Sequence, residues 1–210
     1  MSGRAPAAGG GADPGASVRF FDTQFRAQLQ SGELRLNPFE QAALPWLRGE
    51  VLDYGCGLGN LALAAAERGC RVQALDASAT AIAHLRERSA ARGLPIAAAQ
   101  ADLRDHTPAP QAYDAIVSIG LLMFFGCADA RRQLARLQAA VRPGGIAAVN
   151  VLIQGTTFLD MFDPAQHCLF GRDELLRAFA GWTLLHAAEQ DFEAPRGLRK
   201  RFSTVIARRP

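Results

Sequence analysis

The sequence has few cysteines, and none of them is placed to bind a metal. Its 210 residues include four, which are Cys56, Cys70, Cys127 and Cys168. No two are separated by two residues, and no cysteine–histidine cluster has the spacing of a zinc site. We therefore predict no metal site, and we expect the four thiols to be reduced, as is usual in the cytoplasm.

Long apolar runs are also missing from the sequence. No run approaches the roughly 20 residues that a membrane-spanning helix requires. Residues 1–16 are rich in Ala, Gly and Pro and lack the apolar core of a signal peptide, so we expect them to form a disordered tail. These absences predict a cytoplasmic protein with no membrane partner.

Charge of one sign is not abundant either, because the formal net charge is only +3. The basic residues gather near the C-terminus, between Arg196 and Arg209. Such a segment can bind nucleic acid, but no regular aromatic interleaving and no nucleic-acid-binding module accompanies it. A solvated strand edge explains these charges better, since charged side chains discourage edge pairing. We expect no nucleic-acid partner.

Strand and helix patterns alternate along the chain after about residue 50. The expected strands are 51–54, 72–75, 96–99, 115–119 and 146–153, and the expected helices are 61–68, 78–90, 128–141 and 173–180. This alternation predicts a doubly wound, Rossmann-like α/β fold with a mostly parallel seven-stranded sheet, closed by an antiparallel hairpin of 182–188 and 202–207. Residues 17–210 are expected to form a single domain, in which 17–46 folds into one or two helices.

Three local signals refine this pattern. Ser78 is a plausible N-cap for the helix that follows it, and the helix at 173–180 is expected to carry its own cap. Residues 142–145, with the sequence Arg-Pro-Gly-Gly, predict a turn before the fifth strand.

The most informative segment is 51–60, which reads as a buried strand, an acidic residue and a three-glycine loop that enters a helix. Its pattern is D-x-G-x-G-x-G, from Asp53 through Gly55 and Gly57 to Gly59. A dinucleotide-binding loop would need a further glycine where Asn60 stands. The segment instead resembles motif I of the class I methyltransferases that use S-adenosylmethionine (SAM). The resemblance implies that this loop, with Cys56 between two glycines, surrounds the amino-acid part of the cofactor.

Acidic residues follow the next two predicted strands. Asp76 lies about twenty residues beyond the loop, where an acid commonly binds ribose hydroxyls, although a helix N-cap or turn residue is the alternative. The neighbouring Ala77 could pack on the ribose or the adenine. Asp102 and Leu103 resemble the methyltransferase position that meets the adenine, and Ser118 would end the fourth strand beneath the sulfonium.

An apolar run, 121–125, follows that fourth strand. It could be core, but a dry wall beside a sulfonium suits an in-line methyl transfer because it excludes water.

The C-terminal half is similar to the TehB-like methyltransferases of tellurite resistance. The matching stretches are 122–124, 142–145, 174–176, 181–182 and 201–209. This resemblance implies methylation of a small-molecule acceptor, either a chalcogen oxyanion such as tellurite or selenite, or a thiol. Those proteins carry a His–Arg pair before the last strand, whereas here 191–196 has no histidine and Arg196 takes the place of the arginine.

Transfer to a good nucleophile needs little acid–base help, so we expect no catalytic triad. His167, in the long connection after the fifth strand, is the best candidate for a titrating group near the acceptor, and Arg172, Arg196 and Arg199 could bind an anionic acceptor. Cys127 and Cys168 could form a thiol site or be small core residues. The helical segment 17–46 could be a lid or a simple packing element.

Two other functions stay open at this point. A nicotinamide-dependent oxidoreductase would use a similar fold, although Asn60 argues against it. A SAM-binding protein without turnover would keep the same cofactor motifs. The sequence is compatible with a monomer or a homodimer.

Overall fold

A computed structural model describes residues 16–32 and 34–210 of the chain. The expected disordered tail, 1–16, lies outside the described residues except for Ala16, where the first helix begins. In the described part, no helix is both long and apolar enough to cross a membrane.

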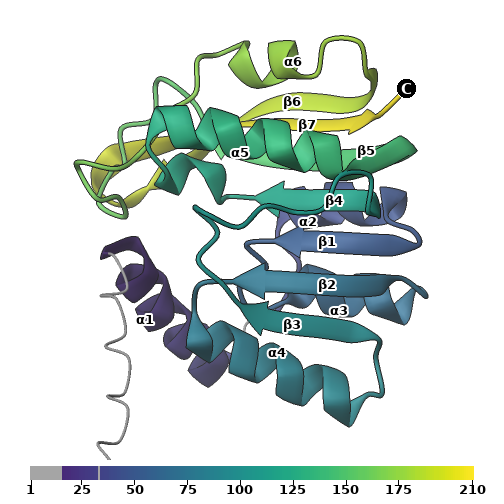
Figure 1. The fold of residues 1–210 in the computed structure, drawn as a ribbon. Coiled ribbons are helices and arrows are strands. Elements are labelled where there is room, and N and C mark those ends of the chain that lie inside the picture. Colours follow the sequence, from purple (N-terminus) through teal and green to yellow (C-terminus); the bar gives the residue numbers. More distant parts are fainter. Residues whose placement is uncertain (1–15, 33) are drawn as a thin grey trace, which may run out of the picture.

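The centre of the fold is a seven-stranded sheet with the order β3-β2-β1-β4-β5-β7-β6 (Figure 1). Neighbouring strands from β3 to β5 are parallel, whereas β7 runs antiparallel to both β5 and β6. The predicted fold class, a mostly parallel sheet closed by an antiparallel hairpin, is confirmed. The strands are β1 (Glu50–Tyr54), β2 (Arg71–Asp76), β3 (Ile96–Gln100), β4 (Tyr113–Ile119), β5 (Val141–Leu152), β6 (Thr183–Ala194) and β7 (Leu198–Arg208).

Helices cover both faces of this sheet. The described helices are α1 (Ala16–Ser31), α2 (Pro38–Ala43), α3 (Asn60–Glu67), α4 (Ala79–Ala91), α5 (Cys127–Ala140) and α6 (Glu174–Ala178), with 3-10 turns η1 (Leu44–Trp46), η2 (Leu122–Phe124) and η3 (Pro195–Gly197). Buried side chains of α5 and α6 pack on one face, and those of α2, α3 and α4 pack on the other. Because side chains alternate along a strand, β1 serves both cores, with Leu52 in the first and Val51 in the second.

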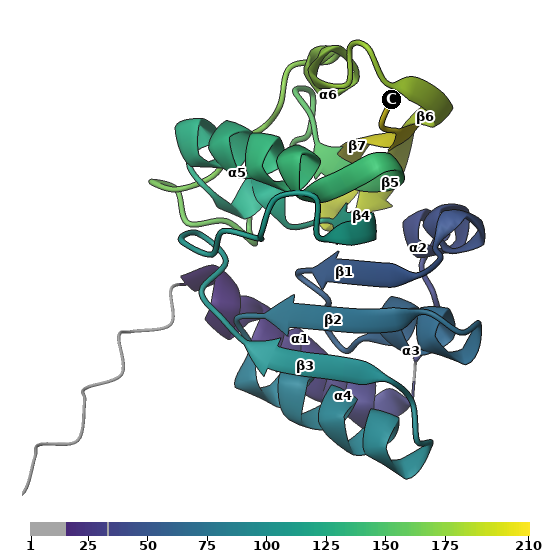
Figure 2. The ribbon, with the colours of Figure 1, turned by 45° about the vertical axis from the view of Figure 1, so that its right-hand side comes forward.

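Helix α1 belongs to neither layer. Figures 1 and 2 show it beside α4, at the edge of the sheet to which the strands β1 to β4 point. The hydroxyl of Ser78, the N-cap of α4, donates a hydrogen bond to Asp22 of α1. Ser78 also accepts the Ala81 N–H, which confirms it as a cap. The carboxyl ends of parallel strands are where ligands bind in sheets of this kind, so α1 lies over the expected site.

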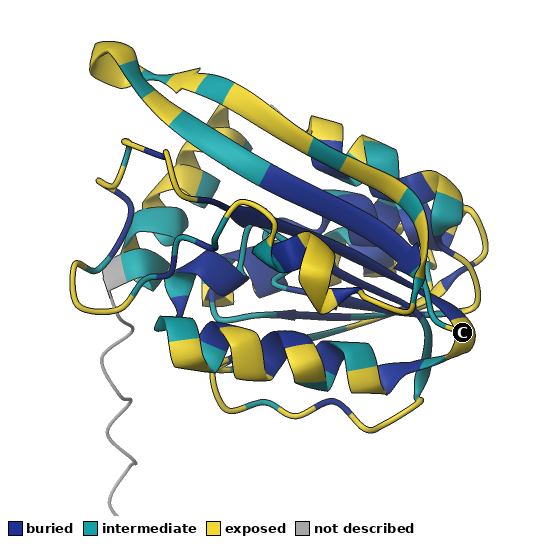
Figure 3. Cartoon of the chain, turned by 90° about the horizontal axis from the view of Figure 1, so that it is seen from above, coloured by how far each residue is buried: buried dark blue, intermediate teal, exposed yellow. Residues whose placement is uncertain are grey.

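The C-terminal part departs from the sequence prediction in three places. The predicted turn at 142–145 lies inside β5 as an irregularity, because the pairing with β4 jumps from Val141 to Ile146. The cap predicted for α6 is wrong, since Asp173 makes no capping bond and the Gly171 N–H instead donates to the Glu174 carboxylate. The hairpin strands are longer than predicted, and β6 has no buried residue, which Figure 3 shows as an exposed edge.

The expectation that all four cysteines are reduced is wrong for two of them. Cys127, at the start of α5, forms a disulfide with Cys168, which lies in the connection after β5. Their Cα atoms are 4.7 Å apart although 41 residues separate them in the chain. Sequence spacing cannot reveal such a pair, because only the packing of the connection against α5 brings the thiols together. Cys56 and Cys70 are free and buried.

Candidate functional site

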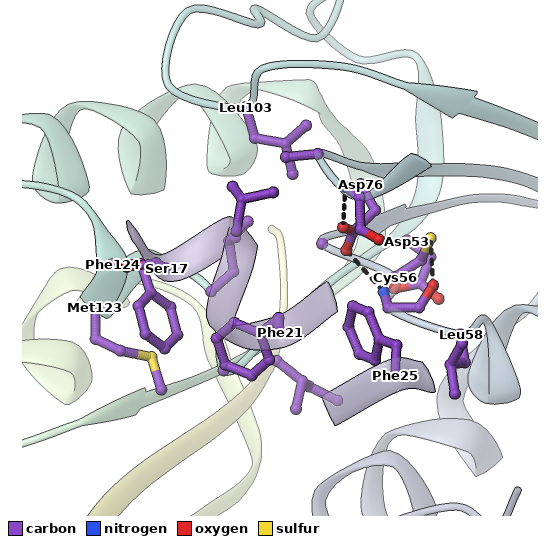
Figure 4. A pocket seen from close by; sticks show the side chains of 18 of the residues that line it. Ser17, Phe21, Phe25, Asp53, Cys56, Leu58, Asp76, Leu103, Met123 and Phe124 are labelled. Carbon is purple, nitrogen blue, oxygen red and sulfur yellow. Dashed lines mark hydrogen bonds between the residues drawn. The ribbon is translucent and has the colours of Figure 1, made fainter. Parts of the chain in front are cut away.

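A cavity of about 780 Å³ lies where the connections after β1 and β4 diverge. In an open α/β sheet, this switch in strand order opens a crevice at the carboxyl ends of the strands. Side chains from α1, the glycine loop, η2 and β7 all line the cavity. Figure 4 shows Phe21 of α1 between two groups of lining residues, with Asp53 and Asp76 on one side and Met123 and Phe124 on the other.

The glycine loop forms one end of the cavity, and its conformation requires glycine. Gly55 and Gly59 have φ angles of +85° and +77°, in the left-handed region that side chains disfavour. A Cβ atom on Gly55 would lie 2.9 Å from the Leu121 side chain, and one on Gly59 would lie 2.5 Å from Leu85. The glycines therefore serve two purposes: they allow the turn, and they let α4 and the β4 connection pack against it.

Asp76, at the end of β2, is held by the loop itself. One carboxylate oxygen accepts the Gly57 N–H and the other accepts the Ser78 N–H, each at 2.8 Å. Asp76 is half-buried, and burial raises the pKa of its carboxyl group. Because Ser78 is the N-cap of α4, Asp76 is not needed in that role. Its carboxylate lines the cavity and still has lone pairs available for hydroxyl donors. Ala77, the next residue, also lines the cavity.

Asp53 is the most unusual group in the site. Its side chain is buried, and one carboxylate oxygen has no hydrogen-bond partner. Burial, together with the nearby carboxylates of Glu40 and Asp76, raises its pKa to about 8. An orphaned acidic oxygen on a cavity wall fits a cationic group that would pair with it, because a buried charge needs a partner.

The loop after β3 forms the next part of the wall. Asp102 lines the cavity, and its bond to Arg104 lowers its pKa. Leu103 also lines the cavity, and its carbonyl accepts a 2.6 Å hydrogen bond from the buried Tyr54 hydroxyl. Gln133 of α5 donates to the same carbonyl, so strand β1 and helix α5 together hold this loop in place from one face of the sheet.

The opposite end of the cavity is aromatic. Phe21 of α1 meets Phe124 of η2 edge-to-face, with ring centroids 5.0 Å apart, and Phe39 of α2 contacts Phe202 of β7 at 4.8 Å. A further aromatic ring, that of Phe25, lies at the other end and covers the glycine loop, because a Cβ on Gly57 would lie 3.3 Å from it. The predicted apolar run at 121–125 is therefore more than core, because all of its members except the buried Leu122 line the cavity.

Comparison with known proteins supports the interpretation of this site. Residues 51–145 match the family described as "Methyltransferase domain". The chain is similar to hemagglutinin 1 of Eikenella corrodens, with 30% identity over 176 residues, 77% of this chain and 55% of that protein. It is also similar to a malonyl-acyl-carrier-protein O-methyltransferase of Salmonella typhimurium, with 36% identity over 106 residues, 50% of this chain and 40% of that protein. The chain spans about half the length of these curated relatives or less.

Among solved structures, TehB of Haemophilus influenzae superimposes with a TM-score of 0.68. The superposition covers 82% of this chain and 61% of that one at 23% identity, which shows a shared fold. Residues 51–145 therefore match a methyltransferase domain, within a fold that the chain shares with TehB. The cofactor of this domain is SAM, which carries two cationic groups, a sulfonium and an ammonium. The cavity fits SAM because the end formed by the glycine loop, the loop end, contains the unpartnered carboxyl oxygen of Asp53.

The methyltransferase domain does not bring every predicted site residue to the cavity. Among the described residues that line it, neither His167 nor Arg196 is present. His167 stacks on Phe162 with ring centroids 5.0 Å apart, and Arg196 forms an ion pair with Asp160 on the surface. Ser118 is fully buried behind the wall, with no partner for its hydroxyl. The roles predicted for these three residues remain predictions.

Several lining residues escaped the sequence prediction, among them Glu40, Asn150, Lys200 and Phe202. A local signal was available for the first, because Asn37 and Glu40 form a capping box at the start of α2. For Lys200 and Phe202 the only signal was their two-residue spacing, which places both side chains on the same face of a strand. Nothing local marked Asn150 as a wall residue.

Proposed function

We propose that this chain transfers the methyl group of SAM to a small-molecule acceptor. The observation that carries the proposal is the buried, unpartnered Asp53 at a loop of glycines, in a cavity whose far end is apolar. SAM supplies an electrophilic methyl group on a sulfonium. An acidic end that holds a cation and a dry end that admits a nucleophile suit this chemistry.

Each group at the loop end has a proposed part in holding the cofactor. Asp53, with Gly55, Cys56, Gly57 and Gly59, would hold the methionine part, and Asp76 with Ala77 would hold the ribose. Asp102 and Leu103 would meet the adenine. The support for this assignment is that these residues line one continuous end of the cavity. Burial raises the pKa of the three carboxyl groups there, from Glu40, Asp53 and Asp76, so a ligand with positive charge would stabilise their ionised forms.

The apolar end of the cavity is where the acceptor would bind, and we call it the acceptor end. Its side chains favour a nucleophile that needs little deprotonation. Within the described lining no histidine is present. A soft nucleophile, a thiol or a chalcogen oxyanion such as tellurite or selenite, reacts with a sulfonium when it is positioned and desolvated. His167 and Arg196 would reach such an acceptor only if the connection after β5 moved toward the cavity.

We further propose that α1 is a lid. Its residues Phe21 and Phe25 cover the cavity, and its Asp22 is fastened to Ser78 at the start of α4. Exchange of cofactor and product would then require α1 to move. We also expect the protein to be cytoplasmic, to be a monomer or homodimer, and to bind no nucleic acid. Labelling of free thiols in intact cells would test the location, because a disulfide between Cys127 and Cys168 is uncommon in the cytoplasm and reactive thiols at both positions would support it.

Calorimetric titration with SAM, S-adenosylhomocysteine and NAD tests the proposal. We expect saturable binding of both adenosyl compounds and none of NAD. Transfer from labelled SAM is then measured with tellurite, selenite and small thiols. A preference for NAD would favour an oxidoreductase, and SAM binding without turnover on any acceptor would favour a non-catalytic SAM-binding protein.

A further inference from the structure

The chain has a single lysine among its 23 basic residues, and this lysine faces the cavity. Lys200 lies near the start of β7, on the same strand face as Phe202, because side chains alternate along a strand. Phe202 is paired with Leu152, the last residue of β5, which places both residues at the carboxyl edge of the sheet. Lys200 therefore belongs to the acceptor end of the cavity, away from the glycine loop.

The ammonium group of Lys200 has no acidic partner among the described residues. Its neighbours in the chain, Arg199 and Arg201, both pair with Asp191 on the surface. Lys200 is instead half-buried, with Nζ 4.7 Å from the centre of the Phe158 ring, and burial lowers its pKa. A lysine that is partly desolvated and unpaired is a receptor for an anion, because a ligand charge would replace the missing partner.

A second polar group on the same wall also lacks a partner. Asn150 of β5 is fully buried, its Nδ2 atom donates to the Thr204 hydroxyl at 2.9 Å, and its Oδ1 atom has no partner. If the side-chain amide were turned over, Oδ1 would bond the Thr204 hydroxyl and Nδ2 would be left without a partner. One of the two amide atoms therefore lacks a partner in either orientation. Asn150 lines the cavity, so one hydrogen-bonding position there is available to a ligand.

Most of the remaining wall at this end is apolar, although Asp163 and Gln166, from the same connection as Met161, also line the cavity. Met123 and Phe124 of η2, Met161 of the connection after β5, and Phe202 of β7 line it together with Phe21 of the proposed lid. A bare inorganic oxyanion has no apolar surface to bury against such side chains. An organic body would bury them, at a gain of about 25 cal/mol for each Å² removed from water.

We propose that this end of the cavity binds the methyl acceptor as a small organic anion, with its charge at Lys200, a polar substituent at Asn150 and an apolar body on the Met–Phe wall. The inference rests on the proposed function and deepens it, because it selects among acceptors. A thiol that carries a carboxylate on an apolar frame has the required chemistry, whereas tellurite and selenite do not.

The test measures binding of acceptor-like probes to protein saturated with S-adenosylhomocysteine. The probes are 2-naphthoate and octanoate, and their neutral counterparts are 2-naphthalenemethanol and 1-octanol. We expect the unmodified protein to bind at least one acid more tightly than its alcohol. Lys200→Met should weaken binding of that acid about tenfold or more and leave the alcohol unchanged, since a hydrogen bond to a charged group is lost.

Two further variants keep the test specific. Lys200→Arg retains the charge and should retain most of the affinity. Arg208→Met removes another half-buried cation from the same face of β7, at the far end of the strand and outside the cavity lining, and should change nothing. The affinity for S-adenosylhomocysteine, measured on each variant, shows that it is folded.

Several results would overturn the inference while leaving the proposed function intact. These are equal binding of acid and alcohol, no effect of Lys200→Met, an equal loss in Arg208→Met, or no binding of either acid by the loaded protein. Failure of S-adenosylhomocysteine to bind would instead remove the proposed function, and the inference with it.

Discussion

The two ends of the cavity are built in different ways. Most of the loop end, namely Asp53, the three glycines and Asp76, comes from one stretch of 24 residues, 53–76, whereas Glu40, Asp102 and Leu103 join it from outside. A key contact within this stretch is local, since the Gly57 N–H donates to the Asp76 carboxylate. The acceptor end draws on α1, α2, η2, β5 and β7, which are far apart in the chain. In the proposed function, the cofactor is thus recognised by a largely local motif, whereas the acceptor is selected by side chains that only packing brings together.

The largest expected effect concerns the close packing at the loop end. Gly59→Ala should lower the free energy of unfolding by about 2–5 kcal/mol, which combines the left-handed backbone cost of about 1–2 kcal/mol with overpacking against Leu85. Gly69→Ala is the matched control, because Gly69 also has a positive φ but has open space around it. Urea denaturation of both variants gives the comparison, and equal losses would show that the contact with Leu85 adds nothing.

The second prediction addresses the acceptor end, which the disulfide fastens. Replacing both Cys127 and Cys168 by alanine should lower the free energy of unfolding by about 2–4 kcal/mol, because the unfolded chain is no longer cross-linked. Denaturation under non-reducing conditions measures this change. Calorimetry should show nearly unchanged SAM affinity, since the bond lies outside the loop end. A clear fall in SAM affinity would contradict this and would show that the disulfide also supports the loop end.

The third prediction concerns cofactor affinity. Asp76→Ala should weaken SAM binding by about 1–3 kcal/mol through loss of the ribose hydrogen bonds and release of the Gly57 N–H. Asp105→Ala removes an exposed carboxylate outside the cavity lining and is the control. Both are measured by calorimetric titration, and unchanged affinity in Asp76→Ala would contradict the assigned role.

The smallest effect is a pH dependence that belongs to the loop end alone. With a pKa of about 8, Asp53 carries a proton at neutral pH in the ligand-free protein, and a bound cation would favour its loss. SAM affinity should therefore rise as the pH rises toward 8 and level off above it, by at most about tenfold for each pH unit. Titrations in buffers of different ionisation enthalpy should show proton release, and Asp53→Asn should abolish it. A flat profile in the unmodified protein would mean that Asp53 meets no cation.

Much of the fold could be predicted because its signals are local. Alternating strands and helices gave the sheet, and the Asp-led glycine triplet after a buried strand identified the loop. Short-range turn chemistry also predicted the cap at Ser78, which the structure confirms. The corresponding prediction for α6 was wrong, because the first helical turn there is held by Glu174 rather than by a cap at Asp173.

By itself, the sequence determined the class of fold and the glycine loop, because backbone conformation and strand polarity follow from neighbouring residues. Only the tertiary structure decided which side chains form the acceptor wall. It joined Cys127 to Cys168, kept His167 and Arg196 out of the cavity lining, and brought Asn150 and Lys200 into it. The physical reason is that contacts between distant segments depend on how the layers pack, and no spacing within the chain encodes that packing locally.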